Sequence, residues 1–207
     1  MSFDMRLFTI NDRHVPVSIL QERLVKAGLP MQITVDTGDE AQWEQISLQF
    51  PDEHYIACIV RDVVTPGSIG EEEIGEFYEQ IDDKLPARNA VWLHEYLGRT
   101  PVIYAIQRLS GVERKGGADA LFMLMNTIHS HTGGLFQVDD MDGCFFTANG
   151  EFLLDVFPPN SRRTIDVAVL HPDGYFMLYP CKLGCKSHRN AFRNGEVPPG
   201  VEFRRMG

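Results

Sequence analysis

The stretch from residue 116 to residue 157 constrains the fold most, because nearly every structural boundary in it has a local signal. Apolar residues recur there at the i, i+3, i+4 and i+7 positions of one helical face: Leu121, Leu124, Met125 and Ile128. Phe122 and Met123 widen that face. Gly133 and Gly134 follow, and paired glycines suit a left-handed helix exit that a side chain would resist. We therefore predict a helix over residues 118–131 that is covered on most sides.

The remainder of this stretch predicts hairpins. Residues 135–138 form a short apolar run, and an acidic turn that ends at Gly143 follows it. Residues 144–148 and 151–157 are β-rich runs separated by Asn149 and Gly150. Asn-Gly favours a type I′ turn, because both central residues of that turn need a positive φ. Antiparallel strands are therefore expected on both sides of this turn.

The acidic turn supplies the first candidate ligand-binding residues: Asp139, Asp140 and Asp142. A calcium-binding EF-hand loop needs oxygen ligands at its first and last positions and glycine at its sixth. If Gly143 takes the sixth position, Val138 and Asn149 fall at the two ends, so the template does not match. The alternative is a solvated turn with local Asx hydrogen bonds.

The rest of the chain alternates between short apolar runs and amphipathic segments. Further helices are expected at residues 16–27, 70–84 and 87–97. Further strands are expected at residues 5–10, 31–35, 43–50, 55–64, 101–109, 164–170 and 175–179. Hairpins dominate, so the predicted fold class is α+β, with a mostly antiparallel sheet built from hairpins and three or four helices packed against it.

Charge divides the chain unevenly. The net charge is −10, yet residues 181–207 hold six Lys or Arg and only two Asp or Glu. We therefore predict a single α+β domain over residues 1–180 and a basic C-terminal tail over residues 181–207. An acidic body disfavours nucleic-acid binding, which depends on neutralising phosphates, and it suits a basic protein partner.

Hydropathy and cysteine usage bear on location. No apolar run approaches the ~20 residues that span a bilayer, so no membrane association is expected. The N-terminus lacks the apolar region of a secretory signal, and four cysteines in 207 residues do not make a disulfide framework. A cytoplasmic protein is expected.

The basic tail contains the candidate metal ligands Cys181, Cys185 and His188. Cysteine and histidine coordinate zinc, and the C-x3-C-x2-H spacing is physically possible. The usual zinc knuckle has C-x2-C spacing, and a fourth ligand would have to come from elsewhere in the chain. We expect no cofactor and an irregular tail without metal, and a zinc site at these three residues is the alternative.

Sequence motifs that would reveal a reaction are missing. The chain has no P-loop, no G-x-G-x-x-G after a strand and no G-x-S-x-G elbow. His94 and Glu95 do not begin a zinc-protease motif, because Gly98 stands where the second histidine belongs. His129 and His131 lie two residues apart on the predicted helix, so they point in nearly opposite directions. We expect His94 to be packed rather than catalytic.

The segment GGLFQVDD, followed by GCFFTANGEFLL, is the most distinctive motif of the chain. Through this motif, and over residues 43–154 as a whole, the chain resembles a family of uncharacterised bacterial intracellular proteins. Met141 and Cys144 depart from the family pattern, in which the acidic turn runs directly into Gly-Phe. The resemblance implies a bacterial, intracellular protein and carries no activity or site residues.

Two functions follow as hypotheses. The first is a non-enzymatic intracellular bacterial protein-binding module with an acidic surface, and this is the one we favour. The second is an enzyme with an unrecognised, metal-assisted site of histidines and carboxylates. The oligomeric state stays open.

Overall fold

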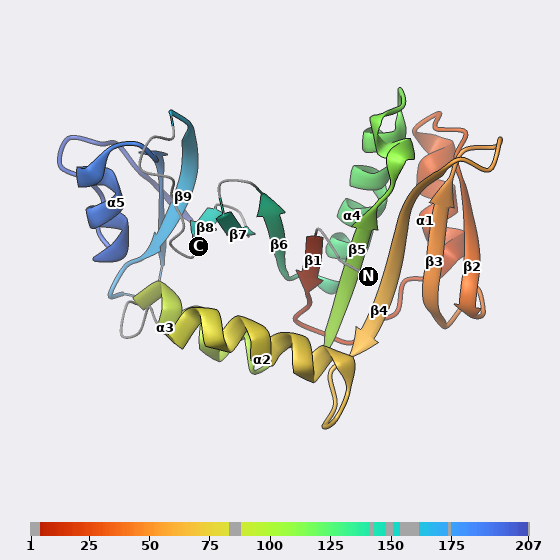
Figure 1. The fold of residues 1–207 in the computed structure, drawn as a ribbon, viewed down its shortest axis with the longest axis horizontal. Helices are drawn as coiled ribbons and strands as arrows, with labels where there is room; N and C mark the ends of the chain where they lie inside the picture. The colour runs from red at the N-terminus through yellow and green to blue at the C-terminus, as the bar shows by residue number, and fades with distance from the viewer. Residues whose placement is uncertain are drawn as a thin grey trace. The chain divides into compact units, whose positions relative to one another are not determined.

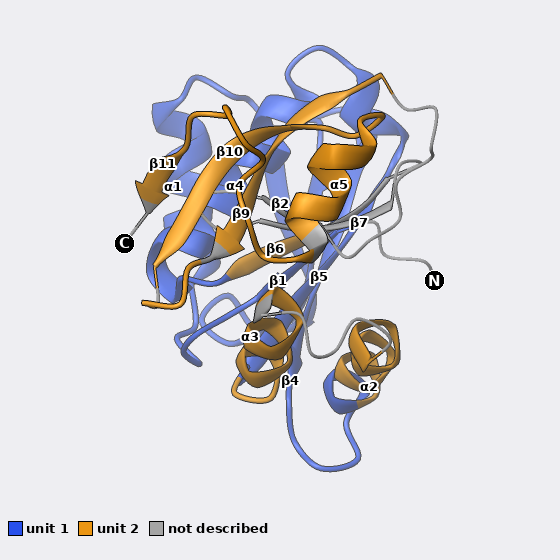
Figure 2. Cartoon of the chain, turned by 90° about the vertical axis from the view of Figure 1, so that its left-hand side faces the viewer, with its two compact units in different colours: residues 1–71, 100–134 blue, residues 72–99, 135–207 orange. Residues whose placement is uncertain are grey.

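The computed structural model describes residues 5–82, 88–140, 143–147, 151–153, 162–173 and 175–206. The chain divides into two compact units (Figure 2). Unit 1 comprises residues 1–71 and 100–134, and unit 2 comprises residues 72–99 and 135–207. Antiparallel strands and helices occur in both, so the predicted α+β class is confirmed. The described part of the chain has five α-helices, where three or four were expected.

Unit 1 is an antiparallel sheet with helices on one face (Figure 1). Its strands are β1 (Met5–Phe8), β2 (Gln32–Gly38), β3 (Trp43–Gln49), β4 (Tyr55–Val63) and β5 (Val102–Arg108). They lie in the order β2-β3-β4-β5-β1, and every neighbouring pair is antiparallel. Its helices are α1 (Val17–Lys26), the 3-10 turn η1 (Ser110–Glu113) and α4 (Gly117–Thr132). The strands expected at residues 43–50 and 55–64 are present as β3 and β4, which pair antiparallel.

A fully buried tryptophan anchors the core of unit 1. The Trp43 indole Nε1 donates a hydrogen bond of 2.8 Å to the carbonyl oxygen of Val15. The Tyr104 ring lies 5.6 Å from the Trp43 ring, centroid to centroid. A buried indole costs free energy unless its N–H finds a partner, so this bond fixes the segment before α1 onto strand β3.

Unit 2 contains the remaining elements. Its helices are α2 (Ile69–Asp82, whose first three residues belong to unit 1), α3 (Arg88–Leu97) and α5 (Lys186–Arg193). Its strands are β6 (Leu135–Asp140), β7 (Gly143–Thr147), β8 (Glu151–Leu153), β9 (Thr164–Leu170), β10 (Phe176–Lys182) and β11 (Arg204–Met206). The antiparallel strands expected on both sides of Asn149 and Gly150 are present as β7 and β8, and β7 also pairs antiparallel with β6. Strand β10 pairs antiparallel with β9.

The sheet formed by β11, β10 and β9 has a helix on each face. On one face, α5 covers an apolar cluster of Val167, Val169, Met177, Tyr179, Cys181, Leu183 and Phe192. On the other face, the Asn89 side chain of α3 donates a hydrogen bond of 2.9 Å to the Ala168 carbonyl, and Trp92 packs edge-on against Phe176. The boundary predicted at residue 180 falls inside β10, and the segment predicted as a basic tail contains α5 and β11.

Two sequence predictions about local structure are wrong. Asp139 and Asp140, expected in a turn, belong to strand β6 and pair with Cys144 and Gly143 of β7. A backbone ladder does not require apolar side chains at a strand end, so charge alone does not mark a turn. The Phe122 side chain of α4, expected to lie on a covered face, is 57% exposed.

Glycine is required where α4 begins. A Cβ atom at Gly117 would overlap the carbonyl oxygen of Gly111, which belongs to the adjacent 3-10 turn. Gly75 in α2 differs, because a Cβ atom there would have no heavy atom within 4 Å apart from its chain neighbours and the backbone of its own helix. The two positions form a matched pair for testing this backbone contact.

We predict that Gly117→Ala lowers the free energy of unfolding by about 1–3 kcal/mol, because the backbones must separate to admit the methyl group. Gly75→Ala should raise it by about 0.5–1 kcal/mol, because alanine loses less entropy than glycine in a helix. Urea unfolding of both variants measures the difference. Equal effects of the two substitutions would contradict the contact between η1 and α4.

Candidate functional site

Helix α2 presents a stripe of carboxylates. Its apolar residues Ile74, Phe77 and Ile81 are buried. Its exposed acidic residues follow helical spacing on the opposite side: Glu72, Glu76, Glu79 and Asp82. The helix contains no Lys or Arg that could neutralise them. We call these four residues the acidic α2 face.

The start of α2 is fixed by side-chain capping. The Ser68 hydroxyl accepts a hydrogen bond of 3.2 Å from the backbone N–H of Glu71. The Glu71 carboxylate accepts one of 2.7 Å from the backbone N–H of Gly67. These two bonds resemble a capping box and satisfy donors that a helix start leaves open.

Helix α3 packs beside α2 through aromatic stacking. The rings of Tyr78 and His94 are 4.0 Å apart, centroid to centroid, and inclined by 18°. His94 is therefore a packed residue, as the sequence predicted. The stack joins the two helices at a position beside the acidic α2 face, whose four residues are exposed.

The candidate metal ligands lie where β10 meets α5. Cys181 is fully buried in β10, Cys185 is partly exposed just before α5, and His188 is almost buried in the first turn of α5. A tight turn connects the two elements, since the backbone N–H of Cys185 donates to the carbonyl of Lys182 at 2.9 Å. The backbone N–H of Lys182 also donates to His188 Nδ1 at 3.2 Å. One imidazole nitrogen of His188 is thus engaged by the backbone.

Over the ranges that the structure describes, no group of three or more His, Cys, Asp or Glu is placed to hold a metal ion. Cys181, Cys185 and His188 share one junction without forming such a group. Zinc binding stays a prediction that depends on these three side chains.

The zinc prediction has a direct test in the purified, untagged protein. Bound zinc should appear as one equivalent in elemental mass spectrometry, and Cys181→Ser with Cys185→Ser should release it and lower the melting temperature, because metal binding stabilises the folded state. Cys58→Ser is the control, because Cys58 is a buried cysteine of unit 1. Absence of metal together with an unchanged melting curve would rule out a structural zinc site.

The described thiols differ in acidity. Burial raises the pKa of Cys181 to about 11, and the neighbouring Cys185 thiolate adds to the effect. Burial also raises the pKa of Cys58. The hydrogen bond with the Ser187 hydroxyl, 3.1 Å from the Cys185 sulfur, is the main factor that lowers the pKa of Cys185. Cys185 is therefore the most nucleophilic of these three thiols at neutral pH.

We predict that iodoacetamide alkylates Cys185 at least ~10-fold faster than Cys58 or Cys181 at pH 7.5, because a thiolate that is accessible reacts first. Peptide mass mapping over time gives the three rates. Ser187→Ala should slow the Cys185 reaction, because it removes the hydrogen bond that favours the thiolate. If Cys58 or Cys181 reacts as fast as Cys185, the assigned environments are wrong.

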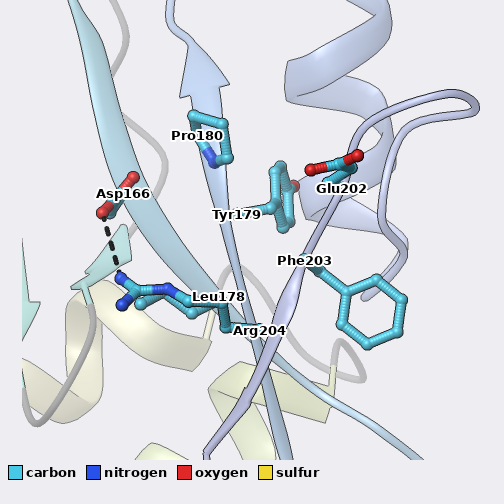
Figure 3. Close-up of a pocket in the computed structure, with 7 residues that line it drawn as sticks. All are labelled: Asp166, Leu178, Tyr179, Pro180, Glu202, Phe203 and Arg204. Atoms are coloured by element: carbon cyan, nitrogen blue, oxygen red, sulfur yellow. Dashed lines mark ion pairs between the residues drawn. The ribbon is translucent and has the colours of Figure 1, made fainter.

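A hollow of about 270 Å³ lies on the β9–β10–β11 sheet (Figure 3). Its lining residues are Asp166, Leu178, Tyr179, Pro180, Glu202, Phe203 and Arg204. Asp166 Oδ2 and Arg204 Nη2 are 3.7 Å apart and form an ion pair across it. The hydroxyl oxygen of Tyr179 is buried without a hydrogen-bond partner in the described part of the chain. The charges of this hollow are mixed and partly paired, so it offers little net charge to a ligand.

The other residues considered from the sequence do not converge. The backbone of Asp139 and Asp140 lies in β6, and Asp142 lies outside the described residues. His129 Nε2 is 3.2 Å from the Gly134 carbonyl, and His131 Nδ1 is 2.8 Å from the Thr127 carbonyl. Each histidine thus has a backbone hydrogen bond close to its own position in α4.

Comparison of the chain with protein-family models, with curated proteins and with solved structures found no match. Among the described residues, no helix combines the length and the apolar character that crossing a bilayer requires. The functional argument therefore rests on the geometry and charge of the chain itself.

Proposed function

We propose that the protein is a non-enzymatic protein-binding module whose acidic α2 face recognises a basic protein partner. The observation that carries this proposal is the exposed stripe of Glu72, Glu76, Glu79 and Asp82 on a helix without a basic residue. The same proposal places the protein in the cytoplasm of a bacterium, as the sequence resemblance implies.

The stripe has an energetic cost that a basic partner would relieve. Like charges at i and i+4 destabilise a helix by about 0.2–0.5 kcal/mol per pair. Buried Ile74, Phe77 and Ile81 and the Ser68 cap compensate for this cost in the folded chain. Lys or Arg side chains of a partner would attract these carboxylates and offset their mutual repulsion. The acidic α2 face should therefore prefer cationic protein surfaces.

The charge of the whole chain acts in the same direction. A net charge of −10 attracts a basic protein before contact and raises the association rate. It repels nucleic acid, which is why we do not propose nucleic acid as the partner. Attraction between exposed charges is screened by salt, with a Debye length of about 8 Å at 0.15 M. Binding through the acidic α2 face should therefore weaken steeply as salt increases.

We predict that a variant with Glu72→Gln, Glu76→Gln and Glu79→Gln loses at least ~10-fold in affinity for the partner, because it lacks three of the four charges that would make the contact. The matched control carries Asp12→Asn, Glu44→Gln and Glu113→Gln, three exposed carboxylates of unit 1 with the same change in net charge. Stoichiometric capture from a lysate of the source cells at 0.15 M and 0.5 M salt gives the comparison.

Wild type and control should retain the same basic protein at 0.15 M salt and release it at 0.5 M salt, and the α2 variant should not retain it. Equal retention by the α2 variant and the control would show that net charge, and not this helix, governs capture. If no stoichiometric partner is recovered under several growth conditions, the result would count against the proposal that the protein is a protein-binding module.

A further inference from the structure

A second pocket, of about 460 Å³, lies where β9 begins and β10 ends. Its lining residues are Arg162, Arg163, Thr164, Lys182, Gly184 and Cys185. All of them belong to unit 2, and we call this site the cation-lined pocket. It is separate from the acidic α2 face in residues and opposite in charge.

Backbone hydrogen bonds fix the frame of this pocket. Thr164 and Lys182 are register partners at the end of the β9–β10 ladder. The pairing continues one step further, since the backbone N–H of Leu183 donates to the Arg163 carbonyl at 3.0 Å. The turn that ends at Cys185 then closes the frame through its bond to Lys182. The cationic residues therefore extend from a backbone that several hydrogen bonds hold in place.

The charge of the pocket is unusual for this chain. Three of its lining residues are cationic and none is acidic, although the chain has 29 Asp and Glu against 19 Lys and Arg. In the described part of the chain, neither Arg162 nor Lys182 forms an ion pair with a carboxylate. Gathering like charges is unfavourable, and an anion bound among them would remove that cost. The hollow beside Asp166 has no such uncompensated positive charge, because its arginine, Arg204, forms an ion pair with Asp166.

We propose that the cation-lined pocket binds the phosphate group of a small molecule. A planar guanidinium donates two parallel hydrogen bonds to phosphate oxygens, and Lys182 adds a point charge. The Thr164 hydroxyl and the open backbone at Gly184 can complete the contact. The charges of Arg162 and Lys182, which have no carboxylate partner in the described part of the chain, match a phosphate better than the single charge of a carboxylate. The volume falls within the ~300–1,000 Å³ range that small-molecule pockets occupy.

This site goes beyond the proposed recognition of a basic protein, and it does not depend on that proposal. The two surfaces favour ligands of opposite charge and share no residue. Loss of partner capture in the α2 variant would leave the phosphate site intact, and loss of phosphate binding would leave partner capture intact.

The test uses the full chain with inorganic pyrophosphate as the probe and inorganic phosphate alongside it. Millimolar pyrophosphate should raise the melting temperature relative to sodium chloride at the same ionic strength, because a ligand that binds only the folded state stabilises it. Arg162→Gln with Lys182→Gln should weaken this binding at least ~10-fold, because each charged hydrogen bond to phosphate is strong. Arg23→Gln with Lys115→Gln is the matched control, since both residues are exposed and lie in unit 1.

Cys185 provides a local readout, because it lines the pocket. Bound pyrophosphate should slow alkylation of Cys185 several-fold and leave alkylation of Cys58, in unit 1, unchanged. This readout needs no variant, so it holds even if a substitution impairs folding. The inference is overturned if pyrophosphate changes neither the melting temperature nor the Cys185 rate. The inference is also overturned if pyrophosphate raises the melting temperature but does not slow alkylation of Cys185, because the binding site would then lie elsewhere. Equal loss of pyrophosphate binding in the two double variants would lead to the same conclusion.

Discussion

The side-chain alternation of strand β10 determines the chemistry of unit 2. Successive residues of a strand point to opposite faces, so Tyr179 and Cys181 enter the cluster under α5 while Lys182 stays exposed. A shift of one residue would bury the lysine and expose the thiol. The register with β9, in which Thr164 faces Lys182, therefore sets both the burial that raises the pKa of Cys181 and the composition of the cation-lined pocket.

The hydrophobic periodicity predicts those elements whose own side chains supply the buried face. Helix α4 and the pair formed by β3 and β4 belong to this group, and the sequence located them to within a few residues. Helix α5 escaped prediction because only Ala191 and Phe192 of its residues are apolar and buried, so no stripe is visible in the sequence. Its helical form depends on packing against β10, which is a tertiary effect that overrides weak local preference.

The extent of β10 was underestimated for a related reason. The sequence predicts a strand that ends at Tyr179, because the composition becomes basic after Pro180. In the structure β11 begins at Arg204, opposite Leu178, so its pairing with β10 does not reach Pro180, which is paired with β9. A proline is tolerated in a strand where one side is unpaired. The same extension brings residues 162–164 beside Lys182, so the sequence could name Cys181, Cys185 and His188 as candidates but not the arginines near them.

The net charge of the chain affects its two proposed sites in opposite ways. Attraction toward the acidic α2 face extends over roughly a Debye length of about 8 Å at 0.15 M salt, so it favours any basic protein that approaches. The same negative charge repels anions at a distance, and only short-range hydrogen bonds from arginine can compensate inside the cation-lined pocket. A long polyanion such as nucleic acid would carry many phosphates outside the pocket into this repulsion. A compact phosphate would meet this repulsion only during its approach. We therefore expect the proposed pocket to favour small phosphorylated ligands over polymers.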